Sequence, residues 1–230
     1  GQRRETPAAE RTSRGEYWNP SLLDERNGHM KATSIILAGG KNLRLGRIKA
    51  LEIIGGKSLI ERVIERLTPI SSRILIVTSL EHSDFPVGGD VEILADLYPG
   101  QGPLVGIYTG LMASRSSYSI VVACDMPFLN TELLDHMLGQ TTDYDAVVPR
   151  LETGLIEPLH AVYSRNCLEK MKERVERGQL AVESLIEALR VKYVQQEEIC
   201  RLDPDLLSFF NINYQSDIDR ALALADEDKG

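Results

Sequence analysis

A glycine-rich segment followed by cationic side chains is the first candidate for chemistry. Residues 37–49 read LAGGKNLRLGRIK, where an apolar run stops at Gly39-Gly40 and the cations Arg44 and Lys49 follow. Glycines let a backbone approach a ligand closely and point successive N–H groups at it, which creates a concavity suited to phosphate oxygens. The two cations would add full positive charge. The segment predicts a phosphate-binding loop; an ordinary strand-to-helix turn with solvated cations is the alternative.

Two better-known phosphate-binding motifs do not fit the sequence. Gly56-Lys57-Ser58 ends as a P-loop ends, but the earlier glycine of that motif would stand at position 51, which is Leu51. The pair Gly39-Gly40 does not continue as G-x-G-x-x-G, so the dinucleotide-binding fingerprint is missing. We therefore expect residues 56–58 to form a turn and the start of a helix.

An aspartate directly after an apolar run is the second candidate. Asp125 follows YSIVVAC at 118–124, the most strand-like run of the chain. A carboxylate at the end of a buried strand can hold Mg²⁺ by one oxygen while water and substrate phosphates supply the other ligands. Taken alone, Asp125 fits a helix cap or a turn equally well.

Two more segments have an unusual composition. DLYPGQGPLVG at 96–106 holds three glycines and two prolines, so it can fix a path that presents Asp96 and backbone groups to a flat ring, although many rigid turns have the same composition. FNIN at 210–213 places Asn211 and Asn213 on one side of an extended segment. Asparagines there are either local backbone partners or ligands.

Short runs rich in Ile and Val alternate with stretches of helical periodicity, which predicts strand and helix units in turn. We expect an α/β, Rossmann-like fold with a mainly parallel sheet and helices on both faces. Ligands bind beyond the carboxyl ends of such strands, so the loops after residues 38, 78, 95 and 124 should hold the site. The expected strands are 34–38, 73–78, 91–95, 118–124, 146–148, 159–163 and 191–194, and the expected helices are 58–67, 103–112, one capped at 130–131, 166–177, 181–189 and 217–225.

Composition narrows the possible partners. The chain has 230 residues, of which 43% are hydrophobic, and its formal net charge is −8. Without a basic excess, neither nucleic acid nor an anionic membrane is an expected partner. No apolar run approaches the roughly 18 residues of a membrane span, and the polar N-terminus has no signal-peptide stretch. We expect a cytoplasmic protein.

Residues 1–30 have scattered charge and no sustained period, so we expect a disordered tail before a single domain at 31–230. His29-Met30 also fits a cloning junction, which leaves the origin of the tail open.

Cys124, Cys167 and Cys200 lie far apart, and the four histidines show no ligand spacing, so neither a disulfide framework nor a zinc site is expected.

Five segments together resemble the molybdenum cofactor guanylyltransferase family, within the glycine-rich-loop nucleotidyltransferases. They are LAGGKNLRLGRIKAL, DLYPGQGPLVGI, VVACDMPFL, EPLHAVYS and FFNIN, and the resemblance spans residues 34 to 225. It implies the nucleotide-diphospho-sugar transferase type of fold. It also implies transfer of GMP from GTP to the terminal phosphate of molybdopterin, with Mg²⁺ bound and pyrophosphate released. Proteins of cofactor biosynthesis or molybdoenzyme maturation are implied as further partners.

The resemblance also implies roles for individual residues. Lys49, Arg44 and Asp125 would carry catalysis, with Lys49 on the nucleotide phosphates. Asp125 and Asn213 would hold Mg²⁺, and Asn211 would support the pterin side or the loop. The nucleotide contacts would come from Leu37, Ala38, Gly39, Gly40, Lys49, Asp96, Gly102 and Asp125.

Three positions depart from the family pattern. Ile48 stands where an acidic residue is usual, Asn42 where a serine is usual, and Leu80 where an asparagine often lies near the base. They leave the choice of nucleotide open. The alternatives are an enzyme that uses CTP or another nucleotide, such as a molybdopterin cytidylyltransferase or a phosphosugar enzyme, and a nucleotide-binding module without catalysis. A glycosyltransferase would usually show Asp-x-Asp where this chain has Ala123-Cys124-Asp125.

Overall fold

A seven-stranded sheet forms the centre of the molecule. The computed structural model describes residues 32–39, 49–79, 85, 88 and 91–227, together with 10–11 and 17–18. Within these residues the strands stand in the order β11-β9-β10-β8-β3-β6-β7, and only β10 runs against the others. Their bounds are Ala32–Leu37 (β3), Ser71–Thr78 (β6), Val91–Ala95 (β7), Tyr118–Ala123 (β8), Ala146–Arg150 (β9), His160–Ser164 (β10) and Val191–Gln195 (β11).

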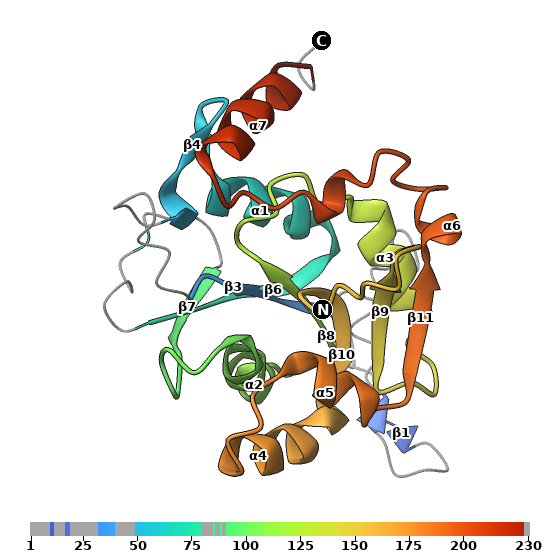
Figure 1. Ribbon diagram of the computed structural model, residues 1–230. Coiled ribbons are helices and arrows are strands. Elements are labelled where there is room, and N and C mark those ends of the chain that lie inside the picture. Colours follow the sequence, from blue (N-terminus) through green and yellow to red (C-terminus); the bar gives the residue numbers. More distant parts are fainter. Residues whose placement is uncertain are drawn as a thin grey trace, which may run out of the picture.

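Helices cover both faces of the sheet. Figure 1 shows α1 and α3 on one side, with α7 beyond α1, and α2, α4 and α5 on the other side. The described part of the chain contains no helix with both the length and the apolar composition to cross a lipid bilayer. The helices are Leu59–Leu67 (α1), Pro103–Ala113 (α2), Thr131–Gly139 (α3), Leu168–Glu176 (α4), Val182–Glu187 (α5), Gln196–Ile199 (α6) and Gln215–Glu227 (α7).

Strand β3, third from one edge of the sheet, contributes side chains to two hydrophobic layers. Ile36 packs with the apolar faces of α1 and α3, while Ile35 and Leu37 pack with those of α2, α4 and α5. Successive side chains of a strand point to opposite faces, so a strand covered by helices on both sides is apolar throughout. All six residues of β3 are buried.

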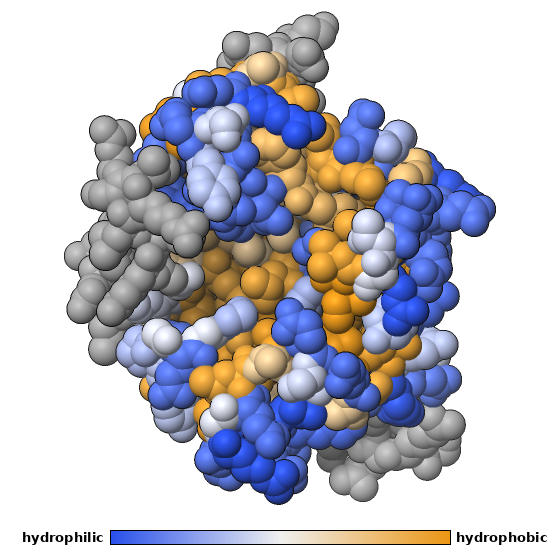
Figure 2. All heavy atoms as spheres, viewed as in Figure 1, coloured by the Kyte–Doolittle hydropathy of each residue, from blue (hydrophilic) through white to orange (hydrophobic). Residues whose placement is uncertain are grey.

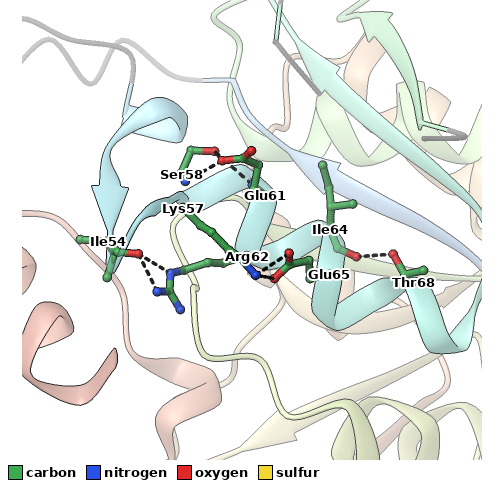
Figure 3. A network of polar contacts seen from close by, with 8 residues as sticks. All are labelled: Ile54, Lys57, Ser58, Glu61, Arg62, Ile64, Glu65 and Thr68. Atoms are coloured by element: carbon green, nitrogen blue, oxygen red, sulfur yellow. Dashed lines mark hydrogen bonds and ion pairs between the residues drawn. The ribbon is translucent and has the colours of Figure 1, made fainter. Parts of the chain in front are cut away.

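The N-terminus of α1 is fixed by polar contacts (Figure 3). Ser58 caps the helix by accepting from Glu61 N (3.3 Å), and Glu61 accepts in return from Ser58 N (2.7 Å). Each bond pairs a backbone N–H that the first helical turn would leave unsatisfied. Arg62 donates from Nε to the carbonyl of Ile54 (2.8 Å), which ties the helix to the hairpin before it.

That hairpin also anchors Lys49. It consists of β4 (Ile53–Ile54) and β5 (Lys57–Ser58), joined by two glycines with positive φ. Just before it, Lys49–Leu51 forms a 3-10 turn, and Glu52 N donates to Lys49 O (3.1 Å). The backbone of Lys49 is therefore held against α1 and the hairpin.

The fold class predicted from the sequence is confirmed. Every predicted strand and helix is present, with ends displaced by a few residues. The predicted helix at 166–177 is a 3-10 turn, Arg165–Cys167, followed by α4. Residues 56–58 form the expected turn and helix cap. The prediction missed the β4–β5 hairpin, the four-residue helix α6 and a short strand pair, Glu10–Arg11 (β1) with Tyr17–Trp18 (β2), inside the expected tail. The rest of residues 1–30 lies outside the described residues.

Candidate active site

The segments that follow four parallel strands are joined to one another by backbone hydrogen bonds. Cys124 N donates to Leu37 O (3.1 Å), Ala38 N donates to Val77 O (2.9 Å), and Asp96 N donates to Thr78 O (2.7 Å). The carboxyl ends of β3, β6, β7 and β8 therefore form one continuous edge. This is the edge at which parallel α/β sheets bind ligands.

Three side chains from distant parts of the sequence meet at this edge. Lys49 donates from Nζ to Asp125 Oδ2 (2.6 Å) and to Asn213 Oδ1 (3.0 Å). The side chains of Lys49 and Asp125 are only 10% and 20% exposed. Lys49, Asp125 and Asn213, which were predicted from separate motifs, are therefore joined by hydrogen bonds from one ammonium group.

Only one of the two carboxylate oxygens of Asp125 has a hydrogen-bond partner among the described residues. Its Oδ1 is buried and has no hydrogen-bond partner among the described residues, although a buried carboxylate oxygen is costly to leave unpaired. Its backbone carbonyl accepts from Ile212 N (3.1 Å), which brings the segment with Asn213 to its side. Mg²⁺ takes oxygen ligands and is usually held by one or two carboxylates with water and substrate phosphates, so Oδ1 of Asp125 fits a magnesium ion, and the amide oxygen of Asn213 is a candidate second ligand. Among the described residues, no three His, Cys, Asp or Glu side chains form a metal-binding cluster.

Asp217 holds the segment that carries Asn213. Its Oδ2 accepts from the backbone N–H of Asn213 (2.7 Å) and of Tyr214 (2.8 Å), directly before α7. These two bonds lower the pKa of Asp217 below its ordinary value, because they favour the charged form. The acidic side chain in the first turn of α7 thereby closes the N-terminus of the helix and sets the position of Asn213.

Asp96 lies at the end of β7 and is held from α2. Its Oδ1 accepts from Tyr98 N and from Thr109 Oγ1, each at 3.2 Å. Thr109 also accepts from Leu97 N (3.3 Å). No contact to Oδ2 occurs within the described residues, so one oxygen of Asp96 remains available to a ligand. Gly102 caps α2 with a φ of 99°, a conformation that favours glycine.

The other predicted residues have the following positions. Leu37 ends β3 and is buried, Ala38 is half-buried, and Gly39 is exposed, with open space around its α-carbon. Gly40 and Arg44 lie outside the described residues. Asn211 donates from Nδ2 to Phe209 O (3.2 Å), a local bond that supports the loop.

Two buried titratable groups lie near the site without taking part in its contacts. Burial raises the pKa of the Cys124 thiol to about 12, so this thiol is unreactive at neutral pH. Burial lowers the pKa of His160 to about 3, and neither ring nitrogen has a hydrogen-bond partner among the described residues. His160 instead packs edge-on against Phe209, with ring centroids 4.9 Å apart.

The face of the molecule shown in Figure 2 is hollowed between the side that carries α7 and the side that carries α2, and hydrophobic side chains line much of the hollow. A mainly parallel sheet with a cation, a carboxylate and an amide at its carboxyl edge defines an α/β protein with a polar site where such sheets bind ligands. The chain belongs to the MobA-like NTP transferase domain family, whose model matches residues 34–194. The resemblance drawn from the sequence motifs is thereby confirmed.

One relative and one solved structure show how far the similarity extends. The molybdenum cofactor guanylyltransferase of Desulfosudis oleivorans is 36% identical over 195 residues, which are 83% of this chain and 94% of the relative. The crystal structure of molybdopterin-guanine dinucleotide biosynthesis protein A from Archaeoglobus fulgidus is 30% identical and matches with a TM-score of 0.73, over 85% of this chain and 99% of that one.

The fold alone extends to other nucleotidyltransferases. The 2-C-methyl-D-erythritol 4-phosphate cytidylyltransferase from Thermus thermophilus matches with a TM-score of 0.65 at 19% identity, over 86% of this chain and 100% of that one.

Sequence reasoning missed two residues that position the site, Thr109 and Asp217. An acidic residue in the first turn of a predicted helix is a signal that could have revealed Asp217. No comparable signal marks Thr109, because its contact with Asp96 depends on how α2 packs beside β7.

Proposed function

We propose that the chain transfers GMP from GTP to the terminal phosphate of molybdopterin, with release of pyrophosphate. The observation that carries the proposal is the convergence of Lys49, Asp125 and Asn213 at the sheet edge of a MobA-like chain. The names of the relatives supply the substrates.

The nucleotide would lie across the ends of β3, β6 and β7. In this proposal the backbone at Leu37, Ala38 and Gly39 contacts the nucleotide, and Gly40 and Arg44 would add further contacts. Asp96, which has one oxygen free of described contacts, would accept N–H groups of the ligand at the far end of this row. Gly102 caps the N-terminus of α2, and without a side chain its backbone can come near the ligand.

The phosphates would lie beside Lys49. Asp125 and Asn213 would hold Mg²⁺, through the buried oxygen of the carboxylate and the oxygen of the amide. When bound, this ion neutralises the negative charge that builds up on the phosphate oxygens. Lys49 supplies a second positive charge from a side chain that is 10% exposed, where little water screens it.

No protein base is needed in this reaction. A phosphate monoester is already ionised near neutral pH, so the attacking oxygen carries its own electron pair. Attack on the α-phosphorus forms one P–O bond, and the P–O bond to the pyrophosphate breaks. The chain's contribution is alignment of the two phosphates and neutralisation of their charge.

Substitution of the lysine tests the proposal. With GTP, Mg²⁺ and molybdopterin, Lys49→Met should lower the rate of pyrophosphate release by about 100-fold, as expected for a lost charge partner in the transition state. Lys57→Met is the matched control, because Lys57 is 51% exposed and pairs only with Glu65 among the described residues. The control should retain its rate. Near-normal turnover by Lys49→Met overturns the proposal.

Thermal unfolding with separate nucleotides tests the choice of base. At 100 times Kd a ligand adds about 2.7 kcal/mol, which raises the midpoint of a domain of this size by roughly 5–10 °C. A shift that requires Mg²⁺ and occurs with GTP alone supports the guanylyl reaction. A shift with CTP instead moves the proposal to a cytidylyltransferase, and no shift with GTP, CTP, ATP or UTP contradicts the proposed nucleotide binding.

A further inference from the structure

Arg150 lies at the same edge of the sheet as the proposed active site. It is the last residue of β9, and β9 runs parallel to β8 because β10 lies antiparallel between them. The start of β10 is joined to the end of β8, where Ala123 N donates to Leu159 O (3.1 Å). Adjacent strands lie about 4.8 Å apart, so Arg150 is displaced sideways by about 10 Å from the strand that leads to Asp125.

An aromatic ring fixes the guanidinium of Arg150. The carbon Cζ lies 3.4 Å from the ring centroid of Tyr193 on the neighbouring strand β11. Tyr193 pairs with Val148, two residues before Arg150, so both side chains stand on the same face of the sheet. Stacking occupies one face of a guanidinium and leaves the N–H groups at its rim able to donate.

This guanidinium has no counter-ion in the described part of the chain. No carboxylate there lies within ion-pair distance of Arg150, whereas Arg73 and Arg190 pair with Glu92 and Asp145. Arg150 is half-buried, and the chain carries an excess of negative charge. A guanidinium that is fixed by stacking and has no counter-ion among the described residues can donate hydrogen bonds to an anionic or carbonyl oxygen of a ligand.

We propose that Arg150, stacked on Tyr193, binds the end of the acceptor that lies farthest from the attacking phosphate. The acceptor class is a planar heterocycle with a phosphate arm at one end and an anionic or carbonyl group at the other. Its phosphate would lie at Asp125, and the ring would extend across β10 toward β9. This assignment rests on the proposed function, since it names the acceptor subsite of that reaction.

Steady-state kinetics with molybdopterin tests the assignment. Arg150→Met should raise the KM for molybdopterin by about 10- to 100-fold, the cost of one lost charged hydrogen bond, while kcat falls less than about 3-fold. Arg150→Lys should recover part of the affinity because it keeps the charge. The midpoint shift with GTP and Mg²⁺ should equal that of the unsubstituted chain.

Arg190→Met serves as the control, because it removes an arginine that pairs with Asp145 at the opposite ends of the same two strands, β9 and β11. It should lower the unfolding midpoint and leave the KM for molybdopterin unchanged. An unchanged KM in Arg150→Met, or equal KM effects in the two variants, overturns the assignment. If the unsubstituted chain binds GTP and transfers nothing to molybdopterin, the proposed acceptor itself is wrong, and the subsite is rejected with it.

Discussion

Loss of the charge on Lys49 should destabilise the fold, and simultaneous loss of the charge on Asp125 should restore part of the stability. The two side chains form an ion pair at 2.6 Å. Lys49→Met leaves the carboxylate of Asp125 without its cation, and Oδ1 already has no partner among the described residues. Asp125→Asn removes that uncompensated charge, so the double variant should be more stable than the two single effects predict.

The size of this coupling follows from the exposure of the pair. At an effective dielectric constant of about 20, two unit charges about 4 Å apart attract by about 4 kcal/mol. Removal of both groups from water cancels much of that attraction. Because the side chains are 10% and 20% exposed, the remainder should exceed the value of about 0.2–1 kcal/mol found for exposed pairs. We expect a coupling free energy of about 1–2 kcal/mol.

Urea unfolding of four proteins measures the coupling: the unsubstituted chain, the two single variants and the double variant, all with EDTA present. The matched control is a second cycle on Lys57→Met and Glu65→Gln, whose side chains also lie 2.7 Å apart but are 51% and 54% exposed. That cycle should give less than about 0.5 kcal/mol. Additivity within about 0.3 kcal/mol in the Lys49 and Asp125 cycle would refute the reasoning.

Three further predictions concern single residues. Burial lowers the pKa of His160 to about 3, so between about pH 6.5 and pH 3 the unfolded chain binds a proton at this residue and the folded chain does not. The contribution of His160 to the free energy of unfolding should be fully present above about pH 6.5 and should fall by about 2 kcal/mol on going to pH 5. His160→Leu should remove this part of the acid sensitivity in urea unfolding, and an unchanged pH dependence contradicts the account. Thr109→Val should raise the KM for GTP about 5- to 10-fold, because it removes the hydroxyl that holds the Asp96 carboxylate. Thr109→Ser keeps a hydroxyl and should return the KM to the value of the unsubstituted chain, whereas equal KM values in both variants argue against a positioning role for Thr109. Gly110→Ala should lower the free energy of unfolding by about 1–3 kcal/mol, because the added carbon would lie 2.5 Å from Ile35 Cγ2. An unchanged midpoint in thermal unfolding would show that β3 moves to make room for the added carbon.

The sheet was predictable because its strands are covered on both faces. A buried strand such as β8 needs apolar side chains at almost every position, and that leaves a run that is visible in the sequence. The cap of α3 was equally visible, since Asn130 accepts from Leu133 N as its position before an apolar period predicted. The β4–β5 hairpin was not predictable in this way, because strands of two residues are too short to show any period.

The site was predictable as a set of motifs, and its contacts were not. Parallel strand order places the loops after β3 and β8 at one edge, so the sequence could indicate that Lys49 and Asp125 belong together. It could not indicate that one ammonium group joins Asp125 to Asn213, which lies 164 residues beyond Lys49. That contact depends on how α7 packs on the β4–β5 hairpin and α1, a tertiary arrangement with no local signature.

The position of Lys49 constrains how the proposed reaction begins. In this structure its ammonium group neutralises Asp125 and is shared with Asn213, the same two residues that would hold Mg²⁺. The ammonium group contacts Asp125 at Oδ2 and so leaves Oδ1 to the ion, but it also contacts Oδ1 of Asn213, the oxygen proposed as the second metal ligand. In the proposed reaction Asp125 and Asn213 would hold Mg²⁺ and Lys49 would neutralise the phosphates, so Lys49 would have to leave the amide oxygen of Asn213 that it contacts in this structure. In both arrangements a cation would lie beside the carboxylate of Asp125, which would offset part of the cost of burying its charge.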